Sequence, residues 1–165
     1  MTQHLILLIF PAAMILAASF DLFTMTIPNW LTAGLAAAFL VLAPMAGLGL
    51  EAIAWHLAAG AAMLIVGFGM FSAGWIGGGD AKLFAATALW LGFEHLLHYA
   101  ILFSLFGGAL TIGLLLARRL PLPMPLLRIS WLARLHDPKS GIPYGIALAI
   151  GGLAVLPATG WLNLS

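Results

Sequence analysis

Residues 52–71 read AIAWHLAAGAAMLIVGFGMF, an apolar run interrupted only by His56. A helix needs about 20 apolar residues to cross the hydrocarbon core of a bilayer, so this stretch predicts a transmembrane helix. Further apolar stretches, separated by short polar breaks, lie at residues 5–20, 30–47, 81–91, 97–117 and 144–162. The sequence therefore predicts an all-α, polytopic membrane bundle of about six transmembrane helices.

The composition agrees with a membrane environment. Of the 165 residues, 64% are hydrophobic and 7% are charged, whereas a soluble domain is about 45–50% apolar and about 25% charged. No segment is long and polar enough for a separate soluble domain, so we expect residues 1–165 to form a single membrane-embedded domain. The chain has no cysteine, which excludes a disulfide, a thiolate nucleophile and a cysteine zinc site.

The basic residues predict the orientation of the bundle. Five of the six cations lie between the last two predicted spans, and basic loops stay in the cytoplasm. These are Arg118, Arg119, Arg128, Arg134 and Lys139. Counting back along the chain, the loops at residues 21–29 and 72–80 also face the cytoplasm. Within the basic loop at about 118–142, residues 126–136 form either an interfacial amphipathic helix or an irregular segment that only sets the topology.

Two aspartates are the strongest candidates for chemistry. Asp21 follows the first predicted span and Asp80 precedes the fourth, so the topology places both at the cytoplasmic face. Two neighbouring carboxyl groups do not both ionise easily and would share one proton. The ionised group can take a proton from water while the protonated group polarises a peptide carbonyl. We therefore predict that Asp21 and Asp80 are the catalytic pair of an aspartic peptidase, without a metal or another cofactor.

The residues around Asp80 favour an approaching peptide strand. Gly77, Gly78 and Gly79 precede it, and glycines allow a close backbone approach that a side chain would hinder. Lys82 either extends to the membrane interface, pairs with Asp80, or biases the carboxyl pair and binds a substrate group. We assign these four residues to an active-site loop.

A second rigid segment follows Asp21. Pro28 fixes its own backbone torsion and biases the residue before it away from a helix, while Asn29 is a plausible cap for the second span. We expect both residues to be structural elements near the site.

Other functions remain open from the residues alone. Asp80 is a common type of helix cap and Asp21 could be a solvated residue beyond a helix end. The chain could then be a small ion- or proton-coupled transporter, or a non-catalytic subunit of a pilus or secretion assembly.

The combined pattern resembles the type IV prepilin peptidases, with the short CpaA/TadV type of the Flp or tight-adherence pilus systems as the closest match. The resemblance rests on Asp21, the Ile-Pro-Asn run at 27–29, the GxGD motif at 77–80 with Lys82, and the Ile-Pro-Tyr-Gly run at 142–145. It implies an endopeptidase of the bacterial inner membrane that cuts the leader from prepilins at the cytoplasmic face.

The resemblance also implies the partners and the limits of the activity. The partners would be a Flp-type prepilin, the lipid bilayer and other pilus or secretion machinery, with no nucleic acid. Longer relatives carry a cysteine zinc motif in a cytoplasmic insertion and also methylate the new N-terminus. Since this chain has no cysteine and no room for the insertion in its first loop, we expect cleavage without N-methylation.

Overall fold

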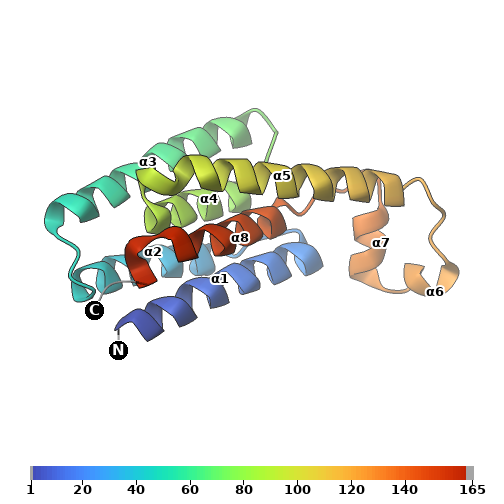
Figure 1. The fold of residues 1–165 in the computed structure, drawn as a ribbon. Coiled ribbons are helices and arrows are strands. Elements are labelled where there is room, and N and C mark those ends of the chain that lie inside the picture. Colours follow the sequence, from blue (N-terminus) through green and yellow to red (C-terminus); the bar gives the residue numbers. More distant parts are fainter. Residues whose placement is uncertain (1, 163–165) are drawn as a thin grey trace.

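A computed structural model describes residues 2–162, and these residues form helices joined by loops (Figure 1). The α-helices are α1 (Thr2–Thr24), α2 (Asn29–Met45), α3 (Leu50–Ser72), α4 (Gly78–Leu91), α5 (Phe93–Ala117), α6 (Met124–Leu127), α7 (Ser130–His136) and α8 (Tyr144–Val155). Two short 3₁₀ turns, η1 (Leu156–Ala158) and η2 (Gly160–Leu162), follow α8. The prediction of an all-α bundle is confirmed.

Each predicted span corresponds to one helix. Three helical segments are long and apolar enough to cross a membrane, namely His4–Thr24, Leu50–Ser72 and Phe93–Ala117. The α2 and α8 segments are shorter apolar helices. Helix α4, with 14 residues, is also shorter than the three long segments. Because many large apolar side chains of α3 and α5 are exposed, these two helices present the surface expected to face lipid.

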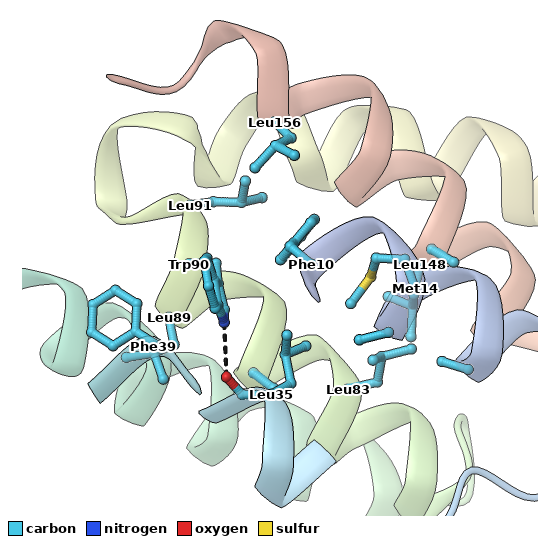
Figure 2. Packing of buried hydrophobic residues seen from close by; sticks show 14 of the residues in the cluster. Phe10, Met14, Leu35, Phe39, Leu83, Leu89, Trp90, Leu91, Leu148 and Leu156 are labelled. Carbon is cyan, nitrogen blue, oxygen red and sulfur yellow. Dashed lines mark hydrogen bonds between the residues drawn. The ribbon is translucent and has the colours of Figure 1, made fainter. Parts of the chain in front are cut away.

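The short helix α4 lies inside the bundle, so it does not need to be long enough to cross the bilayer by itself. Every residue from Leu83 to Leu91 is buried, and α4 contacts α2, α3, α5 and α8. Figure 2 shows Trp90 of α4 among buried side chains of other helices, with its indole Nε1 donating a hydrogen bond to the carbonyl oxygen of Leu35 at 2.9 Å. Protein rather than lipid therefore surrounds most of α4.

Small residues bring α3 and α4 together. A Cβ atom at Gly67 would come within 3.2 Å of both the backbone and the side chain of Ala81. Such close backbone approach is typical of helix pairs in membranes, where van der Waals contact replaces the hydrophobic driving force. This contact fixes the start of α4, which carries the GxGD motif, against α3.

The three loops predicted to be cytoplasmic lie together. In Figure 1 the α1–α2 and α3–α4 connections and the α6–α7 segment are at one end of the bundle, opposite the first residues of α1 and the end of α8. The sequence prediction that Asp21 and Asp80 meet at one end of the bundle is consistent with this arrangement.

The structure decides between the alternatives left open for residues 126–136, and it shortens the last predicted span. The stretch 126–136 is not one helix, because Ile129 adopts an extended conformation (φ −88°, ψ 105°) between α6 and α7. The last predicted span, 144–162, is regular only as far as Val155. Beyond it the chain forms 3₁₀ turns that include Pro157, which has no backbone N–H to continue an α-helix.

Candidate active site

Asp21 lies in the last turn of α1 and points to the start of α8. The prediction that it begins the first loop is wrong, since α1 continues to Thr24. Its side chain is buried, and its Oδ2 accepts a hydrogen bond from the backbone N–H of Gly145 at 2.7 Å. Gly145 is the second residue of α8. The carboxyl group therefore lies at a helix N-terminus, where free N–H groups and the helix dipole favour negative charge.

The contact between Asp21 and α8 requires glycine at position 145. A Cβ atom there would lie 2.8 Å from Oδ2 of Asp21 and 2.8 Å from Cδ1 of Ile27. Any other residue would displace one of these groups. The Ile-Pro-Tyr-Gly run of the sequence thus has a local role in placing Asp21, which the sequence alone did not reveal.

The end of α1 is held by its own backbone. Met25 has a positive φ of 55° and donates its N–H to the carbonyl oxygen of Asp21 at 2.8 Å. A left-handed residue after the last turn is a common helix terminator, although a residue with a side chain pays a conformational cost there. The chain consequently turns sharply at Met25, one residue beyond α1, and returns as the start of α2.

Asp80 is the third residue of α4 and is also buried. Its Oδ2 accepts the backbone N–H of Gly77, the residue that precedes the helix, at 3.1 Å. Its Oδ1 is buried without a hydrogen-bond partner among the described residues. Buried polar atoms are nearly always paired, so this oxygen, which is hidden from solvent, is an exception together with the hydroxyl of Tyr99 among the described residues.

The two aspartates line one cavity of about 230 Å³, which we call the catalytic cavity. The volume is several times the roughly 30 Å³ that one water molecule occupies in the liquid. The remaining lining residues are Met25, Thr26, Ile27, Gly77, Gly78 and Gly79. The structure therefore brings together Asp21, Asp80 and the three predicted glycines.

The predicted active-site loop is mostly helix, because Gly78, Gly79 and Lys82 belong to α4 and only Gly77 precedes it. The α1–α2 loop and the glycine run at the start of α4 both line the catalytic cavity. A Cβ atom at Gly79 would lie 3.0 Å from Cβ and 3.1 Å from the backbone N of Ile27. This close approach explains why the glycine run faces the Ile-Pro-Asn run in space. The sequence carries no local sign of the role of Ile27, because that role comes from a contact with the start of α4, which is distant along the chain.

The predicted capping role of Asn29 is wrong, and one of the three roles considered for Lys82, pairing with Asp80, is not seen. Asn29 is not the cap of α2: Pro28 holds the capping position without a side-chain hydrogen bond, and Asn29 is the first helical residue. The Oδ1 of Asn29 instead accepts a hydrogen bond from Nζ of Lys82 at 2.7 Å. Lys82 therefore joins α4 to α2 beside the site and is not paired with Asp80 in the described structure.

The basic loop contacts the helix end that carries Asp21. Nη1 of Arg134 donates a hydrogen bond to the carbonyl oxygen of Phe23 at 3.0 Å. The Phe23 and Trp131 rings pack edge to face, with their centroids 5.4 Å apart. Through these contacts α7 supports the last turn of α1.

A family model identifies the protein family of the chain. Residues 8–112 match the type IV leader peptidase family, which is more than half of the 165 residues. No curated protein and no solved structure matches the chain. The members of this family are aspartic-type prepilin peptidases, and the matched region includes both Asp21 and Asp80. The chain belongs to the type IV leader peptidase family and is an aspartic-type prepilin peptidase of the membrane.

Proposed function

We propose that Asp21 and Asp80 are the catalytic pair, and that the protein removes the leader of a Flp-type prepilin at the cytoplasmic face of the bacterial inner membrane. The observation that carries the proposal is that two buried carboxyl groups, from helices α1 and α4 that are far apart in the sequence, line one cavity. Gly77, which caps α4, and Gly78 and Gly79, the first two residues of that helix, leave room for the substrate strand.

The reaction follows from one proton shared by the pair. The ionised carboxylate takes a proton from water as the water oxygen attacks the scissile carbonyl carbon. The protonated carboxyl group gives its proton to the carbonyl oxygen, which would otherwise carry the developing negative charge. The C–N bond of the tetrahedral intermediate then breaks as the C=O bond re-forms. The leaving amine takes a proton from the protonated aspartate, and a hydroxyl group of the intermediate gives its proton to the ionised one, so the pair again holds one proton. Since the two groups act as a unit, neither is assigned as the permanent acid or base.

The orientation is supported by the charge distribution. The catalytic cavity lies at the same end of the bundle as α6 and α7 (Figure 1), and the segment around these helices contains five of the six cations of the chain. Basic segments stay on the cytoplasmic side. The protein would therefore span the inner membrane several times and cut on the side from which a leader is reached.

The absence of methylation is supported by the size of the first loop. Only residues 25–28 separate α1 from α2, and the chain has no cysteine to hold a zinc-bound insertion. We expect the mature pilin to carry an unmodified N-terminal amine. Other pilus or secretion components would act after cleavage.

Cleavage of a co-expressed Flp-type prepilin tests the proposal. We expect wild type to yield the shorter mature pilin on a gel, and Asp21→Asn and Asp80→Asn each to accumulate precursor while remaining in the membrane. Asp137→Asn is the matched control and should leave cleavage unchanged. Asp137 is an exposed aspartate in the basic loop at the same end of the bundle. Precursor accumulation in the control, or cleavage by either active-site variant at the wild-type rate, would contradict the assignment.

Mass spectrometry of the product tests the proposal that the enzyme does not methylate the new N-terminus. The mature pilin should have the mass of the unmodified chain. A product heavier by one methyl group would show that this enzyme also methylates.

A further inference from the structure

A second cavity adjoins the catalytic cavity. It has a volume of about 470 Å³ and lies between α3, α4, α5 and α8, within the range of about 300–1,000 Å³ that is typical of ligand sites. We call it the apolar groove. Its walls include Met70, Phe84, Phe103, Ile112 and Leu148.

Asp80 connects the two cavities. It is the one residue among the described linings that belongs to both the catalytic cavity and the apolar groove. A chain held in the groove would therefore lie against Asp80. The Oδ1 of Asp80 is buried without a hydrogen-bond partner among the described residues, so a polar group of a bound chain that reached this atom would meet an unused acceptor.

The position of the groove relative to the membrane restricts what can occupy it. Part of its wall is α5, a helix long and apolar enough to cross a bilayer, and Figure 1 shows α5 running along α8. The α5 residues that line the groove extend from Phe103 to Ile112, which at about 1.5 Å per residue is some 14 Å of helix. Since the length and composition of α5 assign it to the membrane, an occupant that lies along this stretch would meet hydrocarbon and is expected to be apolar.

We propose that the apolar groove binds an apolar segment of the prepilin next to the scissile bond. The inference rests on the proposed function, since Asp80 is its link to the chemistry. A substrate segment in the groove would bury apolar surface against Phe84 and Phe103 while its adjoining peptide group enters the catalytic cavity. A lipid acyl chain could contact the same walls, but it has no polar group to place at Asp80.

Two glycines of α5 provide a matched test. A Cβ atom added at Gly108 or at Gly113 meets no atom within 4 Å, so both positions accept a side chain without disturbing the described structure. Gly108 lines the groove and Gly113 does not. We expect Gly108→Leu to lower kcat/KM for a purified Flp-type prepilin in lipid vesicles at least tenfold, mainly through KM. Gly113→Leu should stay within twofold of wild type.

The outcomes separate this inference from the proposed function. If wild type does not cut the prepilin, the proposed function fails and the inference with it. If wild type, Gly113→Leu and Gly108→Leu all cut the prepilin equally well, the inference alone is overturned and the proposed function stands.

Photocrosslinking gives a readout that does not depend on the activity of the substituted enzyme. Benzoylphenylalanine at position 108, combined with Asp80→Asn to retain the precursor, should crosslink to the prepilin, and the same group at position 113 should not. A crosslink only to lipid at position 108 would overturn the proposal and assign the groove to an acyl chain.

Discussion

Replacing Gly145 by alanine tests how Asp21 is positioned. The new methyl carbon would lie 2.8 Å from Oδ2 and 3.0 Å from Cβ of Asp21, so the carboxyl group must move away from the N–H that it now accepts at 2.7 Å. A hydrogen bond to a charged group contributes about 1.5–3 kcal/mol. At about 1.4 kcal/mol per factor of ten in rate, its loss predicts cleavage roughly ten- to hundredfold slower.

The assay is the initial rate of prepilin cleavage by purified protein in lipid vesicles. Gly141→Ala is the matched control, because a Cβ atom at Gly141 in the preceding loop meets nothing within 4 Å. The control should cut within twofold of wild type. If Gly145→Ala also cuts within twofold while it remains folded, then the contact with α8 does not position Asp21 for catalysis.

Two further predictions concern the supports of the site. Gly67→Leu should separate α3 from the start of α4 and lower the free energy of unfolding by about 1–3 kcal/mol, which is measured as a lower thermal midpoint in detergent. Gly69→Leu is the control and should not lower the midpoint, because a Cβ atom at Gly69 meets nothing within 4 Å. Equal midpoints for the two variants would contradict the close packing. Arg134→Ala should remove the hydrogen bond to the last turn of α1 and speed limited proteolysis of the segment 118–142, and unchanged proteolysis would show that this bond does not hold α7.

The sequence predicted the helices well because each is a long apolar run between polar breaks. Hydropathy does not locate ends within one turn, and α1 illustrates the reason. The residues after Phe20 are less apolar, yet the helix continues through Asp21 to Thr24, since backbone hydrogen bonds rather than hydropathy decide where it stops. The prediction therefore placed Asp21 in a loop although its position in the bundle was right.

The candidate site was partly predictable. Asp21, Asp80 and the glycine run stood out as acids and glycines at the ends of apolar spans. The contributions of Ile27 and Gly145 depend on contacts between segments far apart in the chain. Such contacts leave no local pattern, so the sequence suggested these positions only through a resemblance and gave no physical reason for them.

Lys82 shows a different limit. A cation two residues after an aspartate invites pairing with it, but on a helix residues two apart do not face each other. The side chain of Lys82 instead reaches Asn29 of α2. The pairing that sequence proximity suggested is replaced by one that helix geometry allows.

The cleavage rate of purified Asp80→Asn is the measurement that tests the central claim most directly. An asparagine oxygen can still accept the N–H of Gly77 that Asp80 now accepts at 3.1 Å, so the substitution preserves the local role at the start of α4 and the thermal midpoint should stay close to that of wild type. Acid–base catalysis by a positioned group contributes about 10²–10⁴-fold, and the account predicts a loss of at least this size. A folded Asp80→Asn protein that cuts prepilin near the wild-type rate would contradict it and leave Asp80 as a helix cap.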